Sequence, residues 1–400
     1  MAGTTKFVEG WKTGTDNAGL SVGFAFGSAP FASSCSDMYD RTWYTASTSV
    51  RSARTFRGRT HELDRWGPGT ATIVLDNRSR LFDPACSTNA QAGKVLPGVP
   101  VRIDFKKPGS TAVSPLWSGF VESWDVRYPG LADATVTVKC VDGTKFLNLS
   151  AISTFTTADL TNTMIGHVLD GAGWPSSTGW RDFGVGLSSA QRFKGFRTPA
   201  LQLCRDLADS EAGAFLMGRD GKAFFRTRRW WALSFKSTEA VFGDSTASTE
   251  LPYTDLDLSC DDGQLWNHVT VNRVRGAVQS TWSTASMDLY GKRVLTVNNL
   301  LCPNATKTLD VARWLVKRYE NPGVRVERLE CKPRTSTGIW DVAARGLGET
   351  YRVVRRPPGG GEIAQVCHVE GIENVIDVGG DDWTLGFSLS PASLFPSSSL

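Results

Sequence analysis

Short runs of alternating apolar and polar residues, each followed by a turn signal, constrain the fold of this chain most strongly. In the segment 134–141 every second residue is small or apolar, namely Ala134, Val136, Val138 and Cys140. A period of two is typical of a strand with one buried face. Similar runs occupy 71–75, 99–105 and 116–127. Together these four runs predict one antiparallel β-barrel or sandwich.

The pattern changes to helical spacing after residue 160. Residues 162–172 carry apolar side chains three and four residues apart, and Gly173 ends the run. A second helix is expected to begin with Thr198 as its N-cap and Pro199 at its first position, and to end near Gly213. A hairpin with its turn at 218–221 follows. The pattern in residues 151–232 therefore predicts a small α/β domain.

The remainder of the chain mixes strands with one helix. Strand-like runs cover 265–275, 294–297, 324–331, 351–355 and 364–376. Residues 308–319 have apolar side chains on one helical face and predict a helix. The glycine-rich segment 357–361 predicts a flexible loop rather than a phosphate cradle, because a strand and not a helix follows it. Residues 1–40 and 386–400 are rich in Gly, Ala, Ser and Pro, and we expect them to be weakly ordered or to dock on a partner.

Composition excludes several classes of protein. The chain has 400 residues and is 40% hydrophobic, which is enough to bury more than one core. A formal net charge of +4 argues against a dedicated nucleic-acid binder. No run approaches the length of a membrane span, and the first ten residues do not resemble a signal peptide. The eight cysteines lack metal-site spacing and are interpreted as buried free thiols.

The sequence contains no recognisable catalytic, cofactor-binding or metal-binding motif. It lacks a phosphate-binding loop, a dinucleotide-binding glycine pattern, a zinc-protease motif and a nucleophile elbow. The four histidines, His61, His167, His268 and His368, do not accompany a serine in a catalytic context. The acid pairs at 261–262 and 381–382 lack a calcium-loop pattern and are interpreted as turns. We therefore predict no catalytic residues, no cofactor and no metal.

One segment combines cations with aromatic side chains. Arginine and tryptophan are enriched at the energetic centres of protein interfaces, and they also occur on single-strand nucleic-acid binding surfaces. The small net charge favours the protein interface. The predicted interface residues at this strand end are Arg226, Arg228, Arg229, Trp230 and Trp231. Other tryptophans, Trp11, Trp117, Trp124, Trp174, Trp180, Trp266 and Trp340, are expected in core or interface packing.

An ordered series of short segments resembles minor tail proteins of siphophages that infect actinobacteria. The opening part of the resemblance lies in residues 59–72, 75–77, 80–84, 97–103 and 119–122. It continues in residues 207–213, 220–222, 242–244, 251–253, 267–271 and 365–372. The resemblance covers roughly residues 50–390, and the first 45 residues depart from it.

The resemblance implies a mainly β, α+β fold of the tail-tip or baseplate hub family, with two tail-tube-like β-barrel or sandwich domains in one chain. The expected division is an N-terminal arm (1–45), a first β-barrel hub domain (46–150), an α/β insert (151–232), a second β-barrel hub domain with one helix (233–390) and a C-terminal tail (391–400). Three such chains would supply six barrels, so a threefold ring would continue a sixfold tube.

The implied function is structural and not enzymatic. The chain would be made in the bacterial host cytoplasm and would form a homotrimeric hub in the tail tip of the virion. The expected partners are the distal tail protein or tail tube, the tape measure protein and receptor-binding tip proteins, with DNA only in transit and no membrane span. The ring would gate passage of the tape measure and DNA. Two alternatives remain open, a hexameric distal tail protein and a carbohydrate-binding tail-tip module.

Overall fold

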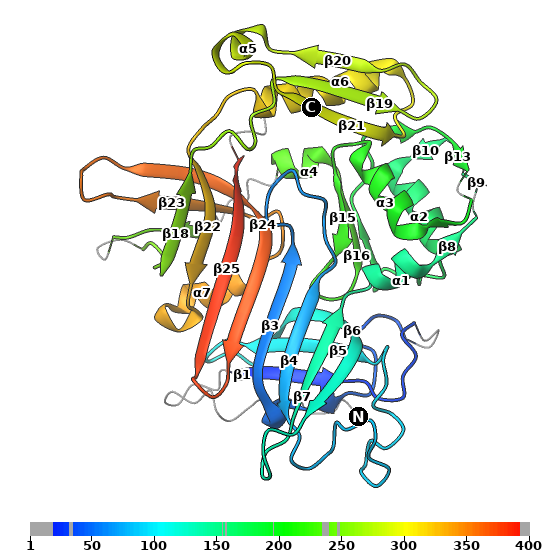
Figure 1. Ribbon diagram of the computed structural model, residues 1–400, viewed down its shortest axis with the longest axis vertical. Coiled ribbons are helices and arrows are strands. Elements are labelled where there is room, and N and C mark those ends of the chain that lie inside the picture. Colours follow the sequence, from blue (N-terminus) through cyan, green and yellow to red (C-terminus); the bar gives the residue numbers. More distant parts are fainter. Residues whose placement is uncertain are drawn as a thin grey trace.

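A single large antiparallel sheet dominates the computed structural model (Figure 1). The structure describes residues 19–392, except 32–34, 154, 157, 195, 234–239 and 246–248. Within these residues, the sheet has thirteen strands, and its main path is β18-β22-β25-β24-β3-β4-β7-β6-β5-β1-β2. The mainly β prediction is confirmed. The described part of this sheet is open and does not close into a barrel.

Two groups of five strands within the sheet have the same strand order. The first module comprises β3 (Val50–Gly58), β4 (Thr70–Asp76), β5 (Pro100–Lys106), β6 (Val113–Arg127) and β7 (Thr135–Val141). The second module comprises β18 (Asp255–Ser259), β22 (Arg325–Cys331), β23 (Thr350–Arg355), β24 (Ile363–Asp377) and β25 (Asp382–Pro391). The order is β5-β6-β7-β4-β3 in the first and β23-β24-β25-β22-β18 in the second.

The two modules are joined by strand pairing and share one core. Residues 371–377 of β24 pair with β3, so the sheet runs from one module into the other. Phe105 of the first module packs against Trp383 of the second at 5.4 Å between ring centroids, and Trp340 packs on Trp383 at 5.3 Å. Trp340 lies on α7 (Thr337–Ala343), which follows a short 3-10 helix, Pro333–Thr335. Burial of these rings on both sides of the join ties the modules together.

The ends of the chain contribute more to the sheet than the sequence predicts. All six residues of β1 (Gly19–Phe24) are buried, and the strand pairs with β5 and with β2 (Tyr44–Thr45). A short 3-10 helix, Ser47–Ser49, precedes β3. The expectation of weak order is therefore wrong for 19–24, and it is wrong for 386–391, which belong to β25. Residues 1–18, which include Trp11, and 393–400 lie outside the described residues.

The α/β part between the modules has its own core. Helices α2 (Thr161–Gly171) and α3 (Ala200–Asp209) pack against the hairpin of β15 (Ala214–Met217) and β16 (Ala223–Arg226). The predicted Thr198 N-cap is wrong, because Thr198 and Pro199 form β14, which pairs with β8 (Ala151–Ile152). The smaller elements are α1 (Thr144–Leu149), β9 (Phe155–Thr156), β10 (Asp159–Leu160), β11 (Arg181–Phe183), β12 (Ser189–Ala190) and β13 (Phe193–Lys194). The next strand, β17 (Ala240–Phe242), belongs to the large sheet and pairs with β23.

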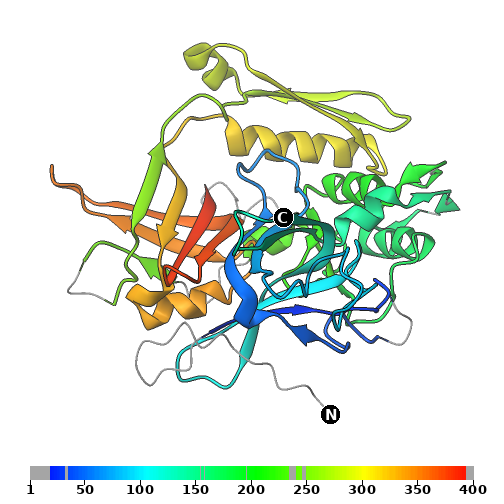
Figure 2. The same ribbon diagram turned by 60° about the horizontal axis from the view of Figure 1, so that its bottom comes forward.

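A separate lobe sits above the second module (Figures 1 and 2). Its three-stranded sheet has the order β20 (Gln279–Trp282), β19 (His268–Arg273), β21 (Val294–Leu300). Helix α6 (Ala305–Tyr319) covers the inner face of this sheet, and α5 (Thr284–Tyr290) follows β20. The predicted helix and strands are confirmed, although α5 was missed. Among the described helices, none has the length and apolar character to cross a membrane.

Candidate functional site

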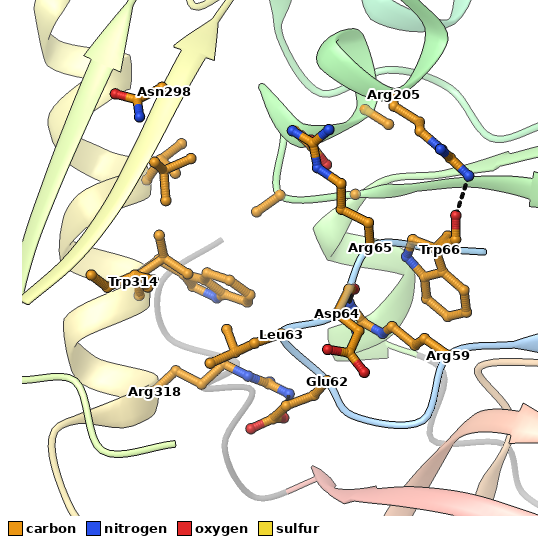
Figure 3. Close-up of a pocket in the computed structure, with 18 of the residues that line it drawn as sticks. Arg59, Glu62, Leu63, Asp64, Arg65, Trp66, Arg205, Asn298, Trp314 and Arg318 are labelled. Carbon is orange, nitrogen blue, oxygen red and sulfur yellow. Dashed lines mark hydrogen bonds and ion pairs between the residues drawn. The ribbon is translucent and has the colours of Figure 1, made fainter. Parts of the chain in front are cut away.

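The loop between β3 and β4, residues 59–69, is anchored to three separate parts of the chain. Arg59 donates from Nε to Glu370 Oε2 of β24 at 2.8 Å. Glu62 forms an ion pair with Arg318 of α6, and Arg205 of α3 donates to the Trp66 carbonyl (Figure 3). The loop therefore links the second module, the lobe and the α/β part at one junction.

The charges at this junction are almost completely removed from solvent. The side chains of Glu62 and Arg318 are each only 1% exposed, and that of Glu370 is 0% exposed. Burial alone would raise the pKa of Glu370, but Arg59 and the Ser390 hydroxyl, which donates at 2.6 Å, hold its pKa below the usual value. Buried ions keep their charge only when a partner compensates the lost hydration. The junction therefore depends on both of its ion pairs.

A neutral histidine lies beside these charges. His368 of β24 is fully buried. Burial lowers the pKa of His368 to about 4, and the nearby Arg318 acts in the same direction, whereas Glu370 opposes the shift. The imidazole is therefore uncharged at neutral pH.

A cleft of about 540 Å³ opens between the same loop, α3, β21 and α6. Leu63 and Trp314 supply an apolar side, while Arg65 extends from the loop toward α3 (Figure 3). Burial raises the pKa of Asp209, on the α3 side, to about 6. The other cleft residues are Arg59, Glu62, Asp64, Trp66, Arg205, Ala208, Ala212, Gly213, Phe215, Leu295, Thr296, Val297, Asn298, Asn299, Val311, Leu315, Arg318 and Tyr319.

Over its described residues, the cleft is lined by carboxylates but lacks a nucleophile–imidazole pair. Its described lining has no histidine, cysteine or serine, so a nucleophile paired with an imidazole base is absent there. In the described parts of the chain, no cluster of three or more His, Cys, Asp or Glu side chains could hold a metal ion. The arrangement instead fixes three parts of the chain in one relative position.

The predicted Arg/Trp segment begins at a strand end, as expected, but continues into a helix. Arg226 ends β16, and α4 (Arg228–Leu233) begins two residues later. The Arg226 guanidinium donates to both carboxylate oxygens of Asp182 at 2.9 Å and stacks on Phe224. Arg226 is thus committed to contacts within the chain. The role of this segment as an interface remains a prediction.

The other residues of that segment differ in exposure. Arg229 is exposed, whereas Arg228 and Trp230 are half-buried. Trp230 packs edge-on against Phe224 at 6.0 Å between ring centroids. The Trp231 side chain lies outside the described residues. Only Arg229 among the described members therefore presents most of its side chain to solvent.

Other residues singled out in the sequence have structural roles. Asp262 pairs with Arg293, Asp261 with Arg325, and Asp382 with Lys332, in keeping with turn and loop acids. Cys35 is half-buried and Cys260 is exposed, so the prediction of buried thiols is wrong for these two; the other six cysteines are buried, and all eight are free. Five of the tryptophans are buried, Trp117, Trp124, Trp174, Trp180 and Trp340, whereas Trp266 is half-buried.

The junction charges were missed as a site by sequence reasoning. Arg59, Glu62 and Glu370 lie in segments that carry the resemblance, but nothing in the sequence connects Glu62 with Arg318, 256 residues away. One local signal was available. Glu370 shares one face of the predicted strand with Val366, Ile372 and Ile376, and a carboxylate on a buried face requires a partner.

Comparison with solved structures shows which fold this is. The chain is similar to a tail protein from Neisseria meningitidis MC58, with 12% identity, a TM-score of 0.64, and coverage of 94% of this chain and 98% of that one. It is similar to the 43 kDa tail protein of prophage MuSo2 from Shewanella oneidensis, with 14% identity, a TM-score of 0.60, and coverage of 94% and 99%. A chain of the PdpA-VgrG complex matches at 7% identity and a TM-score of 0.53, with 94% of this chain and 65% of that chain covered.

Comparisons by sequence give no match. No protein-family model matches the chain, and no curated protein matches it. The likeness to the solved structures extends over nearly the whole chain at low identity, so it establishes a common fold. This chain therefore has the fold of those two tail proteins.

Proposed function

We propose that this chain is a non-enzymatic structural subunit of a phage tail, and that it forms the trimeric hub of the tail tip. The observation that carries the proposal is the whole-chain similarity of fold to two tail proteins. The repeated strand order supports the trimer, because two modules in each of three chains give six similar units around one axis. A ring of this kind can match a sixfold tube.

In this role the protein works mechanically. It joins the tail tube or distal tail protein to host-contacting tip proteins, and it gates passage of the tape measure protein and DNA. The net charge of +4 is compatible with a lumen that DNA crosses, because strong binding of phosphates by Lys and Arg would retard transit.

The first test is location. Virions that encode this chain are labelled with a gold-tagged antibody against it and imaged by electron microscopy. Label confined to the tail tip is the expected result. Label along the tail shaft, on the head, or nowhere on the virion would refute the proposal.

The second test is copy number. The mass of the ring released from disrupted tails is expected to equal three chains. Six chains would instead support the hexameric distal tail protein. A glycan array with the full chain addresses the carbohydrate-binding alternative, for which Trp282, 54% exposed, is one of the exposed aromatic side chains.

A further inference from the structure

The two modules repeat each other at the level of individual hydrogen bonds. In the first, Gly98 N–H donates to the Val121 carbonyl at 2.7 Å, and Val121 N–H donates to the Val99 carbonyl at 2.9 Å. In the second, Gly348 donates to Val369 at 2.7 Å, and Val369 donates to Glu349 at 2.9 Å. The long strands β6 and β24, each of 15 residues, then shift register directly after these valines. This correspondence gives a residue-by-residue alignment of the modules.

The join between the modules uses one edge of β24 in the second module. The equivalent edge of β6 in the first module, at residues 123–127, has no partner strand among the described residues. Residues 371–377 of β24 pair with β25 on one side and with β3 of the first module on the other. The corresponding residues 123–127 of β6 pair only with β7 in the described structure. Likewise β18, which corresponds to β3, pairs only with β22 among the described strands. Within its described residues, each chain therefore makes the join once and leaves both halves of a second join without a strand partner.

The register of the existing join predicts the register of the second one. Across the first module, Arg54 pairs with Thr72, Thr72 with Lys139, and Lys139 with Ser123. Across the second, the matching series is Asp257, Arg328, Ser388 and Gly371. Asp257 thus occupies the position of Arg54, and Ser123 occupies that of Gly371.

This alignment places opposite charges face to face. Arg54 pairs with Val375, which follows Gly371 by four residues, just as Arg127 follows Ser123 by four residues. Asp257 of one copy would therefore lie directly opposite Arg127 of the next. Both side chains are exposed in the single chain. Directly opposed residues of opposite charge stabilise an antiparallel pair, and like charges there destabilise it.

We propose that the free edge of β18 in one copy pairs antiparallel with residues 123–127 of β6 in the next copy, with Asp257 opposite Arg127. The contact is head to tail, since the two edges are different surfaces of the same chain, and repetition of such a contact gives a ring when the rotation between copies closes. Leu256 and Tyr128 lie next to the charged pair in this register, and Tyr128 is 57% exposed in the single chain. The partner is a second copy of this chain, so the inference rests on the ring in the proposed function and specifies its contact.

Reversal of the charges tests the register. Purified full-length chains with Arg127→Asp or Asp257→Arg are compared with wild type by sedimentation velocity over a range of concentrations. Each single variant is expected to lose self-association, because it places like charges opposite each other. The chain that carries both substitutions is expected to recover it. Because both positions are exposed, thermal unfolding of all variants should match wild type and serves as the folding control.

Cysteine cross-linking tests the head-to-tail arrangement independently. Arg127→Cys and Asp257→Cys are introduced separately and together in a Cys260→Ser background, since Cys260 is exposed. After oxidation, neither single variant should cross-link with itself, their mixture should give dimers and nothing larger, and the double variant should give a ladder that ends at three chains.

Several results would overturn the inference. Self-cross-linking of a single variant would indicate a symmetric contact, and no cross-link in the mixture up to the solubility limit would exclude the pairing. Failure of the double charge reversal to restore association would exclude the register. These outcomes are separable from failure of the hub proposal: tail-tip label without cross-links refutes only the strand pairing, and cross-links without tail label refute only the hub.

Discussion

The two β modules share a strand order and each has a glutamate at the same aligned position, but one glutamate is buried and the other is exposed. Glu370 of β24 is fully buried against Arg59, whereas Glu122, at the matching position of β6, is exposed and pairs with Lys145 at 2.7 Å. The difference arises because β3 and its loop lie against β24 in the second module, while no described strand pairs with residues 123–127 of β6 on the equivalent edge. One strand framework thus supports either a sealed ionic junction or an open edge, depending on what lies against it.

The largest expected effect comes from removing a junction charge. Glu62→Gln should lower the free energy of unfolding by about 3–5 kcal/mol, because it leaves the Arg318 guanidinium buried without its carboxylate. Chemical denaturation of the full chain provides the measurement. Replacing both residues with apolar ones, Glu62→Leu with Arg318→Met, should recover much of the loss. A loss below about 1 kcal/mol for Glu62→Gln would show that the junction is not the link between the parts.

Acid should destabilise the protein through the buried His368 of the second module. The pKa of His368 is about 4 in the folded chain and about 6.5 when unfolded, so the unfolded state binds more protons between these values. The free energy of unfolding is therefore expected to fall by about 3 kcal/mol, through this group, as the pH decreases from 6.5 toward 4.

The first module provides the matched control for this titration. Phe120 occupies the position of His368, one residue before the paired valine in each strand. Stability of wild type and His368→Phe is measured by denaturation at several pH values. The loss of stability between pH 6.5 and 4 should be smaller by this amount in the variant. Parallel curves of stability against pH for the two proteins would contradict the role given to His368.

A smaller effect is expected where the backbone of the two modules is in contact. A Cβ on Gly371 would lie 2.6 Å from the Arg59 carbonyl oxygen, so Gly371→Ala should cost about 1–3 kcal/mol through overpacking. Ser123, at the matching position, already carries a Cβ, and Ser123→Ala should change stability by no more than about 0.5 kcal/mol. The unfolding temperatures of both variants are compared with wild type. Equal shifts for the two variants would show that the contact between Gly371 and Arg59 is not responsible.

The smallest effect is expected at the exposed glutamate. Glu122→Gln should alter the free energy of unfolding by about 1 kcal/mol or less, because its partner Lys145 is solvent-exposed and the pair is screened. Added salt should reduce even that difference. If Glu122→Gln in the purified protein lowered the free energy of unfolding as much as Glu62→Gln does, another copy of the chain would already cover Glu122.

Sequence reasoning succeeded where a strand alternates in burial, and it missed β1 and β3. Strands β4 and β7 alternate in burial, and both were predicted. Strand β1 is buried throughout and contains two glycines, so it has neither alternation nor strong β propensity. Strand β3 carries three arginines, and one of them, Arg54, pairs with the distant Glu373. Partners so far apart in sequence leave no local pattern.

The pairing of β3 with β24 also sets an order of events during synthesis. Arg54 and its partner Glu373 are separated by 319 residues, which a ribosome adds in about 15 to 65 s. During that interval the first module has an unpaired strand edge, a known template for aggregation. The nascent chain therefore requires protection of β3 until nearly all of the chain has emerged, and truncated chains that end before β24 should accumulate in the insoluble fraction.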